Sequence, residues 1–275
     1  MRVREHRVVA HNTASMSANK IHDDAVARDY GFDGGLVPGV DVYAYMTRPP
    51  VEAWGIDWLR HGSMRARFMA PVYEGDEVAV VSGEVVESPN GRVVSLEVHN
   101  RAGAVCAVGE AGLPAHPPKA PPIARWPKVA PAVDPPTASP SVLTSGTALA
   151  LAPHRFHAER AHEYLAEVRE TLPLYAEAGV AHPGWLLRDA NYVLSTNLKL
   201  GPWIHVESVA QHHAVVHDGD TIEARATVTK EWERRGHRFV ELDVGLFTAA
   251  DHSSRVAAHV THIAIYRPRP HASSS

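Results

Sequence analysis

The sequence predicts an α+β protein built from two tandem repeats, in each of which an antiparallel sheet wraps around a central helix. Three observations support this fold class: an internal repeat, valine-rich segments of alternating polarity, and a proline-rich stretch between the two halves. Similarity at a fixed spacing indicates that a structural unit has been duplicated. With 275 residues, the chain is long enough for one large domain or two of ordinary size.

The internal repeat is anchored by three pairs of glycines that occur in the same order in both halves. The first pair follows a proline and opens an apolar, helix-like run, and the other two pairs lie in predicted turns. The pairs, with their spacings, are Gly39 and Gly184 (145 residues), Gly75 and Gly219 (144), and Gly91 and Gly236 (145). Such ordered anchors, almost without drift in spacing, favour duplication over chance.

The elements of the first half follow from local patterns. Residues 3–10 predict a first strand, which leads to a short helix, a glycine-rich turn and the central helix that starts at Gly39. Residues 77–87 and 92–100 are rich in valine and alternate imperfectly in polarity, as expected of half-buried strands. The intervening Pro-Asn-Gly at residues 89–91 is typical of a turn.

The second half repeats the strand series at residues 221–233, 237–249 and 254–266. Between the halves, residues 113–140 hold ten of the 21 prolines, and proline fixes φ and lacks an N–H, so we expect an extended connector. The expected organisation is a first repeat at 1–113, a linker at 114–140, a second repeat at 141–268 and a disordered tail at 269–275.

Composition excludes several classes of partner and compartment. The net charge of −4 provides no basic field for nucleic acid, so that partner is not expected. No run approaches the roughly 18 apolar residues that span a bilayer, and the charged N-terminus is unlike a signal peptide. Cys106 is the only cysteine, so neither an internal disulfide nor a two-cysteine zinc motif can form. We therefore expect a cytoplasmic protein that does not bind membranes.

Residues 17–39 carry the most specific motif in the chain. Asn19, Ile21 and His22 precede a glycine-rich turn at residues 30–39 and the start of the central helix. This stretch resembles the MaoC-like (R)-specific enoyl-CoA hydratases and dehydratases, whose motif is Asp-x-Asn-Pro-aliphatic-His. The resemblance covers about the first 80 residues, and the internal repeat extends it to the second half. It implies a double hotdog fold, a small-molecule acyl thioester on CoA or a carrier protein, and no cofactor.

One position departs from this motif in a way that affects the chemistry. Ser17 stands where the family has its aspartate, and Lys20 stands where it has proline. A serine hydroxyl is not a base near pH 7 unless a neighbour activates it. The resemblance therefore implies His22 as the acid-base residue, Asn19 as its helper or equally a helix cap, and Ser17 as a hydrogen-bonding partner for water.

Two residues at the start of the central helix are further candidates. The amide of Gly39 can donate a hydrogen bond to a thioester oxygen, although glycine also permits close backbone packing. Asp41 supplies a rival mechanism, since some hotdog thioesterases carry a carboxylate on this helix, but its position favours the structural role of a first-turn acid. We leave three functions open: a hydratase or dehydratase, a thioesterase using Asp41, and a non-catalytic thioester-binding protein.

The second half is expected to lend binding surface to a single catalytic pocket. His213 and His217 have helical spacing, but a zinc site needs a third ligand, so no metal site is expected. The two repeats should form a pseudo-dimer within one chain, and further assembly into a homodimer remains open.

Overall fold

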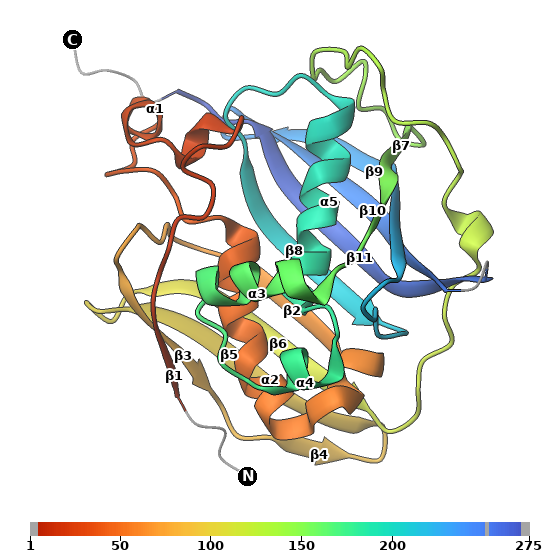
Figure 1. The fold of residues 1–275 in the computed structure, drawn as a ribbon. Helices are drawn as coiled ribbons and strands as arrows, with labels where there is room; N and C mark the ends of the chain where they lie inside the picture. Colours follow the sequence, from red (N-terminus) through yellow and green to blue (C-terminus); the bar gives the residue numbers. More distant parts are fainter. Residues whose placement is uncertain (1–4, 251–252, 271–275) are drawn as a thin grey trace.

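The computed structural model describes residues 5–250 and 253–270 of the chain, so residues 271–275 of the tail predicted at 269–275 lie outside the described part. Within these residues an 11-stranded antiparallel sheet runs through the whole molecule in the order β1-β3-β5-β6-β2-β8-β11-β10-β9-β7, with β4 attached to β5. The sheet curves around two long helices that lie on the same face (Figure 1). This arrangement confirms the predicted fold class.

The elements divide between the two repeats at the linker. The first repeat contains β1 (His6–Val9), η1 (Lys20–His22), α1 (Asp24–Asp29), α2 (Gly39–His61), β2 (Ser63–Phe68), β3 (Glu77–Ser82), β4 (Val86–Ser88), β5 (Gly91–Asn100) and β6 (Val105–Pro114). The linker contains η2 (Ile123–Arg125). The second repeat contains β7 (Ala148–Arg155), α3 (Ala158–Glu167), α4 (Leu174–Ala178), α5 (Pro183–Asn197), β8 (Ile204–His212), β9 (Thr221–Arg234), β10 (His237–Ala250) and β11 (Ser253–Arg267).

The two half-sheets join edge to edge through β2 and β8. These strands pair antiparallel from Ser63 opposite Gln211 to Arg67 opposite Glu207. The central helices start at equivalent places, α2 at Gly39 and α5 at Pro183. Continuous pairing across the repeat boundary leaves no free sheet edge there and places α2 beside α5 in one core (Figure 1).

The glycine anchors of the repeat have a conformational cause. Gly75 has φ 79° and Gly219 has φ 85°, in the left-handed region that residues with a Cβ rarely adopt. Both close a tight turn before a strand, β3 in one repeat and β9 in the other. The equivalent turns therefore retain glycine in both halves.

Helix α2 is enclosed on nearly all sides. Residues 40–47 are all buried because the sheet surrounds one side of the helix and α5 covers another. A helix surrounded in this way shows a continuous apolar run instead of an amphipathic stripe. Its helical path is interrupted at Gly55, where φ is 57°. No helix in residues 5–250 and 253–270 is long and apolar enough to cross a membrane.

The linker crosses the outer face of the sheet and docks there by one aromatic side chain. Trp126 is 1% exposed and contacts Phe247 edge-on, with ring centroids 5.6 Å apart. A Cβ at Gly245 would lie 2.6 Å from the Trp126 ring, so the indole can pack against β10 only because this residue has no side chain. Arg125 and Asp243 form an ion pair of 2.7 Å beside it.

Candidate active site

The loop that carries the motif is held in place by its apolar and acidic residues. Ile21 is 1% exposed and packs in a small cluster with Ala27 and Leu36. Asp23 caps α1 by accepting hydrogen bonds from the first amides of that helix. Asp24 accepts a 2.8 Å hydrogen bond from the Gly35 amide, which ties the loop to the glycine-rich turn. These contacts fix the backbone on both sides of His22.

His22 is half-buried and held in one tautomer. Its Nδ1 lies 2.6 Å from the carbonyl oxygen of Leu36, so Nδ1–H donates and Nε2 carries the lone pair of the neutral ring. Burial lowers the pKa of His22, against the opposing effects of the Leu36 carbonyl and of Asp41. The imidazole is therefore neutral at pH 7, the form in which it can accept a proton.

Asn19 links the motif loop to the second repeat. Its Oδ1 accepts a 3.0 Å hydrogen bond from the Trp203 amide, and its Nδ2 donates a 2.9 Å hydrogen bond to the Trp203 carbonyl. The same Nδ2 lies 3.3 Å from His22 Nε2, and Oδ1 also caps η1. Asn19 thus caps a helical turn and also contacts the imidazole.

Ser17 lies next to this pair but does not bond to the imidazole. Its hydroxyl donates to the backbone carbonyl of Asn19 at 3.2 Å. Within the described part of the chain, neither Ser17 nor any carboxylate is hydrogen-bonded or ion-paired to His22. Among the residues that the structure describes, His22 therefore contacts no acidic partner.

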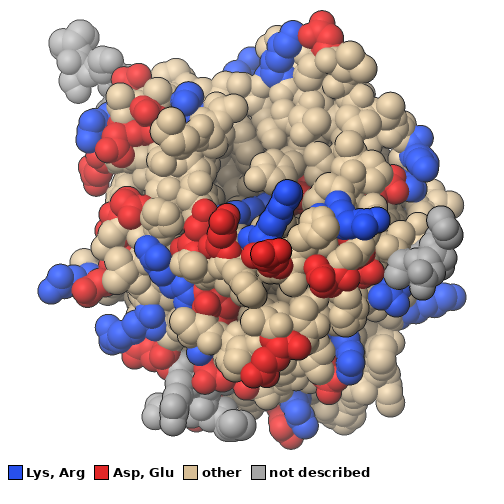
Figure 2. Space-filling model, viewed as in Figure 1, with Lys and Arg blue, Asp and Glu red and all other residues tan. Residues whose placement is uncertain are grey.

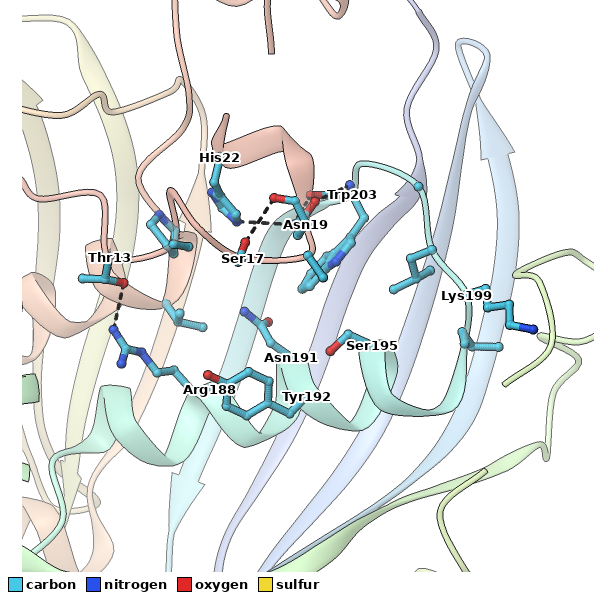
Figure 3. Close-up of a pocket in the computed structure, with 17 residues that line it drawn as sticks. Thr13, Ser17, Asn19, His22, Arg188, Asn191, Tyr192, Ser195, Lys199 and Trp203 are labelled. Carbon is cyan, nitrogen blue, oxygen red and sulfur yellow. Dashed lines mark hydrogen bonds between the residues drawn. The ribbon is translucent and has the colours of Figure 1, made fainter. Parts of the chain in front are cut away.

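Two cavities meet at His22. The first, here called the α5 cavity, has a volume of about 480 Å³ and lies between the motif loop and one face of α5 (Figure 3). Figure 2 shows this hollow opening at the surface among mostly uncharged side chains, with Lys, Arg, Asp and Glu below it. Its lining from α5 consists of Arg188, Asn191, Tyr192 and Ser195.

The second cavity, here called the apolar cavity, has a volume of about 260 Å³. Most of its lining side chains are hydrophobic: Ile21, Phe32, Leu36, Val37, Val42, Phe68, Met69, Val72, Ile204, Val206 and Ile265. Five residues line both cavities and mark their junction: Asn19, His22, Pro38, Asn191 and Trp203. An elongated ligand with one apolar end could therefore pass directly beside His22.

The N-terminus of α2 also lies at this junction. Gly39 lines the apolar cavity and Val40 lines the α5 cavity, while Pro38 is the N-cap and provides no side-chain hydrogen bond. The first amides of a helix have no acceptor within the helix and carry the positive end of its dipole. They can therefore stabilise negative charge on an oxygen placed there.

Gly39 is closely packed as well as near the junction. A Cβ at this position would meet His205 Nδ1 at 3.0 Å and a Phe68 ring carbon at 3.1 Å. His205 belongs to a buried chain in which Ser208 Oγ lies 2.8 Å from His205 and 3.0 Å from His262. Burial holds the pKa of His205 well below its usual value, so this chain is uncharged at pH 7.

Asp41 lines neither cavity, although its partners Thr13 and Arg188 line the α5 cavity. Its side chain is 0% exposed, accepting hydrogen bonds of 2.6 Å from the Thr13 hydroxyl and 2.9 Å from the Arg188 guanidinium. Arg188 stacks over the Tyr164 ring at 4.4 Å and lies 3.7 Å from Glu167. Asp41 thus joins α2 to α5 in a buried ion pair, and both of its oxygens are already occupied.

The start of α5 differs from the start of α2. His182 caps it, because its Nδ1 accepts a 3.0 Å hydrogen bond from the Gly184 amide. The rings of Tyr164 and Tyr175 pack around His182, with centroids 5.6 Å and 4.7 Å away. Side chains thus cover the helix start of the second repeat, whereas that of the first meets two cavities.

Binding surface was expected from the second repeat, but no site residue was named there. Asn191 and Trp203 lie at the junction, but they are more than 160 residues from the motif. One signal was present: Arg188, Asn191, Tyr192 and Ser195 recur at i, i+3, i+4 and i+7, which puts four polar side chains on one face of a central helix. The two hydrogen bonds between Asn19 and the backbone of Trp203 correspond to no pattern in the sequence.

The sheet, the paired central helices and the edge-to-edge junction define a double hotdog. Among solved structures, a protein provisionally assigned as a MaoC domain dehydratase from Chloroflexus aurantiacus J-10-fl superposes with a TM-score of 0.65 and 13% identity, covering 98% of this chain and 96% of that one. A conserved hypothetical protein of Mycobacterium tuberculosis with a double hotdog fold gives 0.64 and 16%, covering 96% of each chain.

The structural similarity extends beyond dehydratases. A protein provisionally assigned as a thioesterase II from Thermobifida fusca YX gives a TM-score of 0.51 and 15% identity, covering 96% of this chain and 94% of that one. No family model and no curated protein matches the sequence. At these identities the comparisons establish the double hotdog fold, as predicted, and the chemistry must be argued from the site.

Proposed function

We propose that this chain is a hydro-lyase that acts on acyl thioesters of CoA or a carrier protein. It would add water across a 2-enoyl thioester, or remove it from a 3-hydroxyacyl thioester, with His22 as the acid-base residue. One observation carries the proposal: a neutral imidazole lies where an apolar cavity, a second cavity and an uncapped helix N-terminus meet.

The shape of the site suits a thioester. The acyl tail would fill the apolar cavity, where burial of its methylene groups favours binding. The carrier would leave through the α5 cavity, and the thioester carbonyl would then lie beside the first amides of α2. The amide of Gly39 is the candidate donor to that oxygen.

The proposed reaction needs only one proton-transferring group. In hydration, His22 Nε2 takes a proton from water while the water oxygen bonds to C3, and the electron pair of the double bond moves towards the thioester oxygen. The resulting imidazolium returns the proton to C2, which restores the neutral ring. Dehydration is the reverse, with the 3-hydroxyl leaving as water.

The neighbours of His22 have supporting roles in this scheme. The Leu36 carbonyl fixes the ring so that Nε2 keeps the lone pair, and the clamped amide of Asn19 limits its rotation. Ser17, in the α5 cavity, would contribute a weak hydrogen bond to water without taking its proton.

Thioester hydrolysis by Asp41 receives less support. A carboxylate that attacks or activates water must reach the substrate, and Asp41 is fully buried and paired with Thr13 and Arg188. Hydrolysis therefore enters the test below as a competing outcome, as does binding without turnover.

The deciding experiment follows crotonyl-CoA in two assays, loss of the enoyl absorbance and release of free thiol. The wild type should lose enoyl absorbance without releasing thiol, and His22→Ala should lower turnover at least ~100-fold, the usual scale of acid-base catalysis. His116→Ala, which changes an exposed linker histidine, serves as the control and should leave turnover unchanged.

Three results would contradict the proposal. A fully active His22→Ala protein would remove the imidazole from the mechanism. Thiol release that depends on Asp41 would identify a thioesterase. Binding of butyryl-CoA and crotonyl-CoA with neither reaction would identify a thioester-binding protein.

A further inference from the structure

Asn191 is a polar side chain without a polar partner. Its Oδ1 is buried and accepts no hydrogen bond, and within residues 5–250 and 253–270 no group hydrogen-bonds to its amide. The residue as a whole is half-buried, and its Oδ1 is the buried atom. A buried polar atom without a partner costs free energy, and native proteins satisfy most such atoms. An unsatisfied amide at a cavity therefore indicates that a bound molecule completes it.

The position of Asn191 shows where that molecule would lie. Asn191 comes from α5 of the second repeat, yet it lines both cavities together with Asn19 and His22 of the first. Figure 3 shows it rising from α5 towards the loop that carries Ser17, Asn19 and His22. It therefore faces the acid-base residue from the opposite wall of the junction.

We propose that Asn191 is a further catalytic residue, which binds the oxygen that adds to or leaves from C3 of the acyl chain. This inference rests on the proposed hydro-lyase activity and names the recognition element for its oxygenated substrate. The oxygen would be held between two walls, by the amide of Asn191 on one side and by His22 Nε2 on the other.

The chemistry of an amide fits this role. Its NH₂ can donate to the reacting oxygen and its carbonyl can accept a hydrogen bond from the same water or hydroxyl. It cannot take a proton, so it positions the oxygen while His22 performs the transfer. Ser17 is less suited, because its hydroxyl proton already bonds to Asn19 and it lines only the α5 cavity.

The proposal predicts selective binding as well as turnover. A 3-hydroxyacyl thioester would satisfy the Asn191 amide, whereas the saturated analogue would leave it without a partner. One hydrogen bond to a buried polar group corresponds to roughly 5- to 10-fold in affinity. The site should therefore prefer (R)-3-hydroxybutyryl-CoA over butyryl-CoA by about that factor, and Asn191→Ala should abolish the preference.

The test measures both dissociation constants by calorimetry in a His22→Ala background, where turnover does not interfere. The three proteins compared are His22→Ala alone, His22→Ala with Asn191→Ala, and His22→Ala with Thr196→Ala. Thr196 lies on α5 and lines neither cavity, so its substitution should keep the preference. With His22 present, Asn191→Ala should lower turnover of crotonyl-CoA roughly 10-fold or more.

The outcomes separate this inference from the proposed function. If Asn191→Ala keeps both the preference and the turnover while His22→Ala is inactive, the Asn191 assignment is wrong and the hydro-lyase stands. If Asn191→Ala weakens both ligands equally and lowers the melting temperature, its role is structural. If no thioester binds and none reacts, the proposed function itself fails.

Discussion

The buried ion pair between Asp41 and Arg188 should respond asymmetrically to substitution. Arg188→Met would leave the Asp41 carboxylate, 0% exposed, with only the Thr13 hydroxyl as a donor. Removing one partner of a buried pair typically costs ~3–5 kcal/mol, because the remaining charge is uncompensated. We expect a loss of that size in the free energy of unfolding.

Asp41→Asn should cost less. The amide still accepts a hydrogen bond, and the remaining Arg188 side chain is 18% exposed, lies 3.7 Å from Glu167 and stacks on an aromatic ring. Its charge therefore stays partly solvated and compensated, and we expect a loss of ~1–2 kcal/mol. The double variant removes both charges and should cost less than the sum of the single changes, a coupling of ~1–3 kcal/mol.

The assay is urea unfolding at pH 7 followed by tryptophan fluorescence, with free energies compared only where the slope against urea is unchanged. Arg60→Met is the matched control, since its pair with Asp57 is 3.3 Å long but lies on the surface, and it should change stability by less than ~1 kcal/mol. The reasoning is refuted if Asp41→Asn destabilises as much as Arg188→Met, or if Arg188→Met behaves like Arg60→Met.

Three further predictions concern the site and the core. Ser17→Asp should raise crotonyl-CoA hydration roughly 100-fold, because a carboxylate would share the water with the nearby imidazole and raise its pKa; an unchanged rate would argue against a hydratase site. Gly39→Ala should destabilise by ~1–3 kcal/mol and lower turnover, because its Cβ would meet His205 at 3.0 Å, and a fully active variant would contradict that packing. Burial lowers the pKa of His212 to about 4 and of His262 to about 3, so below pH 6.5 the unfolded chain binds more protons than the folded one. The free energy of unfolding should therefore be highest above pH 6.5 and fall on acidification, by ~2 kcal/mol per buried histidine at pH 5. Urea unfolding above pH 6.5 and at pH 5 should show a smaller fall for His262→Gln than for the wild type. A fall of the same size in both proteins would exclude His262 as its source.

The fold could be predicted because its determinants are local. Gly75 and Gly219 close turns that need positive φ, and alternating apolar residues identify the strands that follow. Residues 42–46 form a continuous apolar run, as expected of an enclosed helix. These signals depend on neighbours in sequence, and because the unit is duplicated, the turn and strand signals occur in both repeats.

The candidate site could be predicted only in part, because its completion depends on distant pairs. The motif identified the loop of His22 and Asn19, since its spacing is local. Nothing near Asn19 in the sequence indicates that it pairs with the backbone of Trp203, and nothing near Asp41 indicates Arg188. Each of these pairs arises from the side-by-side packing of the repeats, which periodicity does not encode.

The N-terminus of α5, which side chains cover, has a consequence for how the sequence of such a protein can evolve. When two identical subunits form a hotdog dimer, each substitution appears at both helix starts, so neither can be altered alone. Here His182 and Tyr164 cap and cover one start while the other stays open. Because the linker joins the two unlike repeats in one chain, every molecule contains one copy of each. The linker also keeps the two repeats at high effective concentration. Selection can then act on the second helix as a wall of a single site, independently of the first.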